Sequence, residues 1–291
     1  QKRKPLPLKP QAPLGTIRCS YPFEVVSWDI MGPLPKSERG NKYILVITDL
    51  FSKWVEAFAL AVTDSETLAS VLVDEVVCRY GVPRVLHSDQ GANFNSQVIQ
   101  SLCKILGINK TRTTAYHPQC NGQVERFNRT LQSILSKLVS ENQKDWDRHL
   151  QNALFAYRVA FHETSGYSPF RVNFGRSPIL PVDIAIGRPR NEVLEEGAVS
   201  VPEYVEKLST SMRSIYNDVK LRLDSAQKRS KQQYDKEVSG ERFSAGDQVW
   251  LYVPAVKQGR SKKLAALWRG PYTIIDRLIT DFNLLDPPRL S

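Results

Sequence analysis

The order of the apolar segments is the feature that most constrains how this chain folds. Three short runs rich in β-branched and aromatic residues, at 23–30, 43–47 and 54–60, predict three strands of one sheet. Two further short runs, at 85–86 and 109–114, alternate with amphipathic helical segments. The order β-β-β-α-β-α-β-α therefore predicts an α/β domain in which helices flank a mixed five-stranded sheet.

The first two helical segments have clear apolar stripes. The first is expected to begin at a capping box, Thr63-Asp64-Ser65-Glu66, and to end at Gly81. Its stripe consists of Leu68, Val71, Leu72 and Val76, and the stripe of the second helix consists of Val98, Ile99, Leu102 and Leu106. Both helices should cover the sheet with these faces.

A third helical segment is expected from about 122 to 142. Its core stripe consists of Val124, Phe127, Leu131, Ile134, Leu135 and Leu138. This spacing leaves four polar residues together on another face: Glu125, Asn128, Arg129 and Gln132. A further amphipathic helix, with Trp146, Leu150, Leu154 and Tyr157, is expected to be core.

Three carboxylates lie at element ends and are candidate catalytic residues: Asp29, Asp89 and Glu125. Asp89 follows a buried strand and precedes Gly91, the place where open α/β sheets bind ligands. Hard cations such as Mg²⁺ or Mn²⁺ prefer oxygen ligands, and a metal pair can activate a phosphodiester. For Glu125 alone, the alternative is a surface ion pair with Arg129.

Several motifs resemble the integrase of retroviruses and Ty3/gypsy-type retrotransposons. They are Trp28–Pro35, Ile47–Trp54, the segment from Asp89 to Phe94, and Ala115–Gln119 leading into Glu125. The catalytic signature of that family, two aspartates and a glutamate with 35 residues between the second and third, is matched at Asp29, Asp89 and Glu125. The resemblance spans nearly the whole chain and implies an RNase H-like catalytic core.

The resemblance implies a DDE-type polynucleotidyl transferase, an integrase and endonuclease. Such an enzyme trims the 3′ ends of the element's DNA and joins them to target DNA, using two Mg²⁺ or Mn²⁺ ions held by Asp29, Asp89 and Glu125. The implied partners are element DNA ends, target DNA and further copies of the chain. The implied location is the nucleus, with a cytoplasmic particle stage. The DNA-contacting residues would be Tyr116, His117, Gln119, Asn121, Asn128 and Arg129. Lys262 and Lys263 lie in a basic stretch that is either a solvated hairpin tip or a loop that contacts phosphates, and they are further candidates for DNA binding.

The expected domain organisation follows the same resemblance. Residues 1–20 form a basic, proline-rich linker, and residues 21–187 form the catalytic core. Residues 188–240 contain a linker and a long polar helix, expected to bridge domains or to pack against another subunit. Residues 241–291 resemble the small SH3-like barrel with a Gly-Pro-Tyr signature, one strand short. The family's zinc domain is expected upstream, so the chain is interpreted as truncated.

Charge and cysteine usage narrow the function further. The net charge of +10 divides into +5 for residues 1–20, −1 for residues 21–203 and +6 for residues 204–291. Cationic flanks around a neutral middle favour binding to nucleic acid.

The four cysteines have no metal-ligand or disulfide spacing and are expected to be free thiols. No apolar run approaches the roughly 18 residues that a membrane span requires.

Two other functions remain open at this point. An integrase-derived host protein could bind DNA or chromatin without catalytic turnover, although an intact carboxylate triad argues against the loss of catalysis. A plain RNase H-like nuclease shares the fold and the metals, but it does not explain a basic carboxyl-terminal module.

Overall fold

The computed structural model describes residues 18–89, 91–112, 122–187, 200–236, 246–252, 268–277 and 283–285. The chain divides into two compact units, one of residues 16–228 and the other of residues 1–15 and 229–291. The candidate carboxylates all belong to the larger unit.

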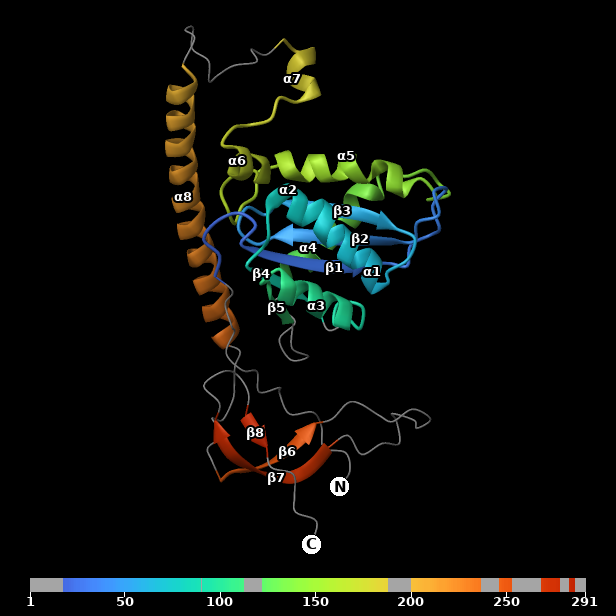
Figure 1. Cartoon of the computed structure of the whole chain (residues 1–291), viewed down its shortest axis with the longest axis vertical. Helices are drawn as coiled ribbons and strands as arrows, with labels where there is room; N and C mark the ends of the chain where they lie inside the picture. The colour runs from blue at the N-terminus through green and yellow to red at the C-terminus, as the bar shows by residue number, and fades with distance from the viewer. Residues whose placement is uncertain are drawn as a thin grey trace. The chain divides into compact units, whose positions relative to one another are not determined.

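The larger unit is built on a mixed five-stranded sheet (Figure 1). Its strands are β1 (Val25–Met31), β2 (Tyr43–Asp49), β3 (Val55–Leu60), β4 (Val85–Ser88) and β5 (Asn109–Arg112). They lie in the order β3-β2-β1-β4-β5, with β1–β2 and β2–β3 antiparallel and β1–β4 and β4–β5 parallel. All five predicted strands and the RNase H-like core are confirmed.

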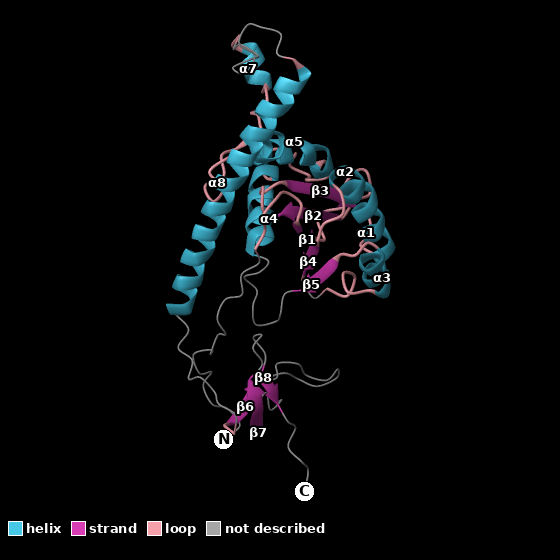
Figure 2. Cartoon of the chain, turned by 60° about the vertical axis from the view of Figure 1, so that its left-hand side comes forward, coloured by secondary structure: helices cyan, strands magenta, loops and turns pink. Residues whose placement is uncertain are grey.

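Helices cover both faces of this sheet, as Figures 1 and 2 show. One face carries α1 (Ser65–Val71), its continuation as a π-helical stretch (Leu72–Val77) and α2 (Cys78–Tyr80), together with α3 (Gln97–Ile105). The other face carries α4 (Gly122–Leu135) and α5 (Trp146–Val159). The period-two alternation of β1 turns Trp28 toward the first helix layer and Met31 toward α4 and α5. Asp29, two residues from Met31, therefore belongs to the α4 face.

Three details of the helices differ from the predictions. The first helix is capped by Asp64, whose side chain accepts a hydrogen bond from the Thr67 N–H, so Thr63 is not the cap. α4 ends at Leu135, and Leu138 is exposed because it lies in the turn beyond the helix. Val98 is also exposed, because Ile99 and Cys103 are the α3 residues that face the sheet.

The long polar helix is confirmed as α8 (Val201–Lys236), which follows the short helices α6 (Pro169–Phe174) and α7 (Pro181–Ala185). Its sparse apolar residues Ile215, Val219 and Leu223 are buried against the same chain's own core. Their partners include Cys19, Val25, Phe51, Val85 and Val172. Part of α8 is therefore a structural element of the larger unit, whereas the sequence predicted a bridge between domains or a contact with another subunit.

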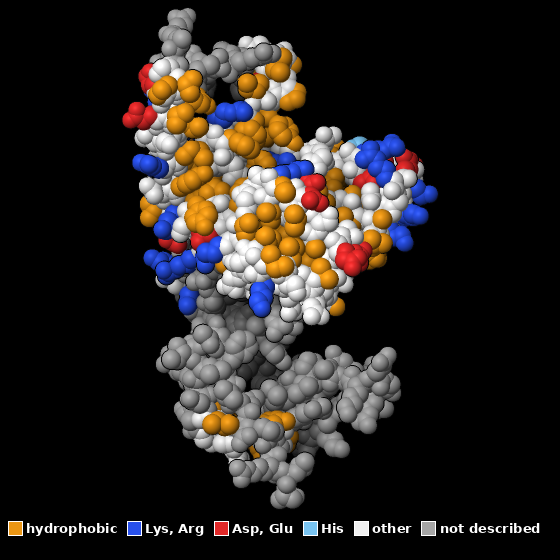
Figure 3. All heavy atoms as spheres, in the orientation of Figure 1, with side chains coloured by type: hydrophobic (Ala, Val, Ile, Leu, Met, Phe, Trp, Pro, Cys, Tyr) orange, Lys and Arg blue, Asp and Glu red, His pale blue; other side chains and the backbone are white. Residues whose placement is uncertain are grey.

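Other apolar side chains of the larger unit remain at its surface. Figure 3 shows hydrophobic side chains along α8 and over the neighbouring part of the unit. The exposed ones include Val182 and Ile184 of α7 and Tyr204 and Val205 near the start of α8. For this first part of α8, contact with another subunit stays a prediction.

The smaller unit contains a three-stranded antiparallel sheet in the order β6-β7-β8. Its strands are β6 (Gln248–Tyr252), β7 (Trp268–Arg277) and β8 (Asn283–Leu285). Gly270-Pro271-Tyr272 lies in β7, and the Gly270–Pro271 bond is cis. The assignment of this unit as an SH3-like barrel remains a prediction. Across the described ranges of the chain, no helix is long and apolar enough to cross a membrane.

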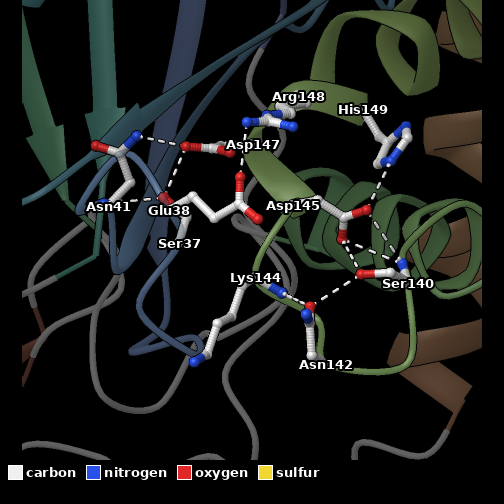
Figure 4. A network of polar contacts seen from close by, with 10 residues as sticks. All are labelled: Ser37, Glu38, Asn41, Ser140, Asn142, Lys144, Asp145, Asp147, Arg148 and His149. Carbon is white, nitrogen blue, oxygen red and sulfur yellow. Dashed lines mark hydrogen bonds and ion pairs between the residues drawn. The ribbon is translucent and has the colours of Figure 1, made fainter.

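A polar network ties the β1–β2 loop to the beginning of α5 (Figure 4). The buried Asp147 accepts hydrogen bonds from Ser37 Oγ at 2.7 Å and from Asn41 Nδ2 at 2.8 Å. Glu38 and Arg148 form an ion pair at 2.6 Å beside it. This network lies past the carboxyl end of α4, whereas Glu125 lies in the first turn of that helix.

Candidate active site

Two of the candidate carboxylates are brought together by the pairing of β1 with β4. The parallel register aligns Val25 with Val85, Val26 with Leu86, and Ser27 with His87. The same offset, continued two residues further, brings Asp89 level with Asp29. Neighbouring strands lie about 4.8 Å apart, so the two residues are adjacent at the end of β4. This is the edge of the sheet at which the sequence predicted a ligand site.

The backbone around Asp89 holds its carboxylate close to the chain. Asp89 Oδ1 accepts a hydrogen bond from the Gly91 N–H at 2.8 Å. A Cβ atom at Gly91 would lie 3.0 Å from the same oxygen, so a larger residue here would require the carboxylate to shift by a few tenths of an ångström. Ser88 Oγ donates to the Asp89 carbonyl at 2.8 Å, and Lys110 Nζ donates to Ser88 Oγ at 2.7 Å. The segment after β4 is therefore anchored on both sides of the carboxylate.

The third carboxylate, Glu125, is presented by α4. Val124, Phe127 and Leu131 bury one stripe of the helix against the sheet and α5. Glu125 lies outside this stripe and is exposed in the first turn. Asn128, almost one turn further, donates from Nδ2 to Asp29 Oδ2 at 2.8 Å. That bond turns the polar side of α4 toward β1. The periodicity predicted that Glu125 and Asn128 share this side of the helix.

The electrostatics of the site are dominated by Asp29. Its partial burial is the main cause that raises the pKa of this carboxyl above its usual value, and the charges of Asp89 and Glu125 raise it further. The hydrogen bond from Asn128 acts in the opposite direction. Asp89 and Glu125 therefore lie close enough to Asp29 to affect its ionisation.

The oxygen donors of the site fit a hard divalent cation. A nearby cation would offset the burial and the like charges that disfavour ionised Asp29. Asn128 Oδ1 is buried, and no hydrogen-bond partner for it is found in the part of the chain that the structure describes. In that same part, no three His, Cys, Asp or Glu side chains are gathered closely enough to enclose a metal ion. The sequence predicted such convergence, and the described residues do not show it.

The predicted DNA-contacting residues are only partly covered by the structure. Arg129 is exposed on α4, and the alternative ion pair between Glu125 and Arg129 is not formed. Asn128 is the residue that binds Asp29. The remaining six residues predicted to contact DNA lie outside the described residues: Tyr116, His117, Gln119, Asn121, Lys262 and Lys263.

His87 is a buried residue of β4 that contacts the neighbouring strand. It is 2% exposed, and its Nδ1 lies 2.9 Å from Thr111 Oγ1 on the neighbouring strand β5. Burial, with a contribution from Lys110, lowers the pKa of its imidazole, so the neutral form is favoured. Cys19, Cys78 and Cys103 are free thiols, as predicted, and Cys120 lies outside the described residues.

Two polar residues that join the β2–β3 turn to the first turn of α4 were not predicted from the sequence. Lys53 is only 7% exposed, and its Nζ donates to Gln123 Oε1 at 2.7 Å. Neither residue falls on an apolar stripe or matches a metal-ligand spacing, so nothing in the periodicity marks them. Lys53 does lie within the Ile47–Trp54 motif, which was the available indication.

Comparisons with known proteins show which proteins this chain is similar to. Residues 20–118 match the integrase core domain family. The chain is 33% identical over 237 residues to the Pol polyprotein of Radiation murine leukemia virus (strain Kaplan), which is 81% of this chain and 38% of that protein. It is 28% identical over 255 residues to the retrovirus-related Pol polyprotein from transposon 412 of Drosophila melanogaster, which is 87% of this chain and 20% of that protein.

A solved structure shares the fold across most of the chain. It is the simian T-cell lymphotropic virus intasome in complex with PP2A regulatory subunit B56 gamma, with a TM-score of 0.53 and 20% identity. The match covers 97% of this chain and 82% of the chain in that complex. By contrast, the chain spans well under half the length of the Pol polyproteins that it matches.

Proposed function

We propose that this chain, which carries the integrase core domain of retroviruses and retrotransposons, processes the 3′ ends of element DNA and transfers them into target DNA. The observation that carries the proposal is the β1–β4 register, which when continued by two residues brings Asp89 level with Asp29, together with Asn128 of α4, which donates to Asp29 almost one turn after Glu125. The divalent cations that catalyse phosphoryl transfer prefer oxygen donors of this kind, and open α/β sheets bind ligands beyond the carboxyl ends of their strands.

Asp29, Asp89 and Glu125 would hold divalent cations, Mg²⁺ or Mn²⁺, which when bound supply Lewis-acid activation of a phosphodiester. Asn128 orients the Asp29 carboxylate through its amide and keeps that oxygen directed toward α4. The Gly91 N–H holds one Asp89 oxygen in place. These contacts preorganise the carboxylates before DNA binds, which reduces the ordering required at the reacting geometry.

DNA binding is proposed to rest mainly on phosphate contacts. Arg129 is exposed, and it lies on the same helix as Glu125, so it can reach a phosphate of the element's DNA end. The positive charge of the two flanks supplies a sequence-independent attraction. Target choice should therefore depend weakly on base sequence. Action on DNA would place the protein in the nucleus.

The test is a Mn²⁺-dependent cleavage and strand-transfer assay on oligonucleotides that carry the element's ends. Asp89→Asn removes a charge and keeps the volume, so we expect an intact fold and loss of both reactions. Asp74→Asn is the control, because Asp74 is a carboxylate of the π-helical stretch, on the other helix layer, and accepts a hydrogen bond from Ser70. Cleavage by Asp89→Asn at the wild-type rate would overturn the assignment of the site.

The alternative function is an integrase-derived protein that binds DNA or chromatin without turnover. It predicts that wild-type protein binds DNA and yields no cleaved or joined product with either Mg²⁺ or Mn²⁺. Under that outcome Asp89→Asn and wild type would behave alike in every DNA assay.

A further inference from the structure

A buried lysine lies under the helix that carries Glu125. Lys53, in the β2–β3 turn, is 7% exposed, and it adopts a left-handed backbone conformation with φ of 66°. A buried ammonium is costly unless it is well hydrogen-bonded. No carboxylate forms an ion pair with Lys53 in the described part of the chain. Its two hydrogen bonds must therefore account for its position.

Those hydrogen bonds join the turn to the first turn of α4. Lys53 Nζ donates to the Leu50 carbonyl at 2.6 Å and to Gln123 Oε1 at 2.7 Å. Gln123 Nε2 donates in return to the Asp49 carbonyl at 3.0 Å. The oxygen and the nitrogen of the Gln123 amide thus both bond to the β2–β3 turn. These three hydrogen bonds are termed the Lys53–Gln123 clamp.

The turn that holds the clamp is itself rigid. The Asp49 carboxylate is buried and accepts hydrogen bonds from the Phe51 N–H at 3.3 Å and from the Ser52 N–H at 2.8 Å. Ser52 Oγ also donates to this carboxylate at 2.5 Å and accepts from the Trp54 N–H at 3.1 Å. A locked turn can fix the position of whatever it binds.

What it binds is the start of α4, two residues before Glu125. The first turn of a helix lacks a preceding turn to hold its N–H groups, so its position depends on contacts from outside the helix. The apolar stripe of α4 fixes the depth of the helix on the sheet. The clamp adds a polar restraint at the end of the helix where Glu125 lies.

We propose that Lys53 and Gln123 are positioning residues that set the place of Glu125 relative to Asp29. The clamp acts on Glu125 only through the helix backbone and touches neither DNA nor metal. The inference rests on the proposed function for its effect on activity, and on geometry alone for its effect on α4. Burial of the ammonium lowers the pKa of Lys53 to about 8.

Three variants test the clamp. Lys53→Gly removes the ammonium and suits a φ of 66°, so relief of backbone strain and of buried charge should offset the packing that the side chain provides. Gln123→Ala removes the clamp from the other side. Gln123→Glu keeps an acceptor for Lys53 and is the conservative variant expected to retain part of the function.

The control is Asn41→Ala, which removes a hydrogen bond to buried Asp147. The polar network around Asp147 lies past Leu135, the carboxyl end of α4. At 1.5 Å per residue, Leu135 is about 15 Å along the helix from Glu125. Two measurements are independent of activity. One is hydrogen exchange of the amides from Arg126 to Arg129, which bond to the carbonyls of the first turn of α4, and the other is the rise in melting temperature caused by Mn²⁺.

We expect Lys53→Gly and Gln123→Ala to exchange these amides faster and to lose most of the Mn²⁺-induced rise. Their kcat for DNA cleavage should fall at least tenfold with little change in KM for DNA, whereas Asn41→Ala should match wild type in all three respects. Equal exchange and equal Mn²⁺ stabilisation in wild type and Lys53→Gly would overturn the inference. If wild type cleaves no DNA, the proposed function fails, while exchange and Mn²⁺ stabilisation still decide the role of the clamp.

Discussion

At the residue scale, the site is a set of polar groups whose properties come from their neighbours. Asp29 is a carboxyl with its pKa raised by burial and by two further carboxylates, and Asn128 is the amide that favours its ionised form. Arg129 is exposed and makes no ion pair with Glu125. An exposed guanidinium beside such a site is available for an external anion.

Arg129→Ala should therefore impair 3′-end processing and strand transfer by about tenfold or more, because a charge-assisted hydrogen bond contributes roughly 1.5–3 kcal/mol. Arg129→Lys should restore the rate only in part, since an ammonium cannot clamp a phosphate with two parallel bonds. Rates on a matched DNA-end substrate check this. Full activity of Arg129→Ala would show that Arg129 is an ordinary solvated residue of α4 and does not bind DNA.

His162 gives a separate prediction for stability against pH. Burial is the main cause that lowers its pKa from 6.5 to about 4, and the charges of Lys53 and Arg126 add to it. Between these two values the unfolded chain binds more protons than the folded chain, so stability is lost as pH falls from 6.5 toward 4.

A His162→Gln variant cannot titrate, so its loss of stability across this window should be smaller than that of wild type. Urea unfolding at pH 7, 6, 5 and 4.5 measures the difference. Parallel pH profiles for the two proteins would contradict the assignment.

At the element scale, α8 is held by the core through its apolar residues and through a close approach to a glycine. Ile215, Val219 and Leu223 are buried against the core of the larger unit. Gly175 ends α6 with φ of 69°, and a Cβ atom there would lie 2.8 Å from both Leu208 Cδ1 and Met212 Sδ of α8. This helix therefore packs where a glycine leaves room for it.

Gly175→Ala should destabilise the protein in two ways. The left-handed backbone costs about 1–2 kcal/mol for a residue with a side chain. The ends of the half-buried Leu208 and Met212 side chains must also shift, which adds about 1 kcal/mol. Gly107→Ala is the matched control, because Gly107 has φ of 68° and nothing within 4 Å of an added Cβ. Chemical denaturation should show the larger decrease in stability for Gly175→Ala, and equal decreases would show that α8 does not constrain this position.

At the scale of the whole molecule, charge is separated along the chain. The middle segment, which contains the three carboxylates, has a net charge of −1, while the segments before and after it carry +5 and +6. An almost neutral catalytic segment gives DNA little general attraction. The flanks must therefore supply most of the counterion release on binding.

Removal of residues 1–20 and 241–291 should weaken DNA binding and flatten its dependence on salt. The slope of log K against log salt should decrease by about 0.9 for each phosphate that the trimmed protein no longer neutralises. Titrations at several salt concentrations, with the folded state of the trimmed protein checked by circular dichroism, measure this. An unchanged slope would place the phosphate-binding residues in the core.

The sequence by itself determined the succession of strands and helices along the chain and the buried stripe of α4, and it selected the three candidate carboxylates, because these depend on local periodicity and on spacing along the chain. Only the tertiary structure decided which of these residues form hydrogen bonds with one another. Asn128 and Asp29 are 99 residues apart, and Lys53 and Gln123 are 70 apart, yet each pair forms a hydrogen bond. It also decided that α8 packs on its own core. Such contacts depend on which side chains the folded sheet and helices bring within about 3 Å of one another. The periodicity of the sequence does not predict these long-range contacts.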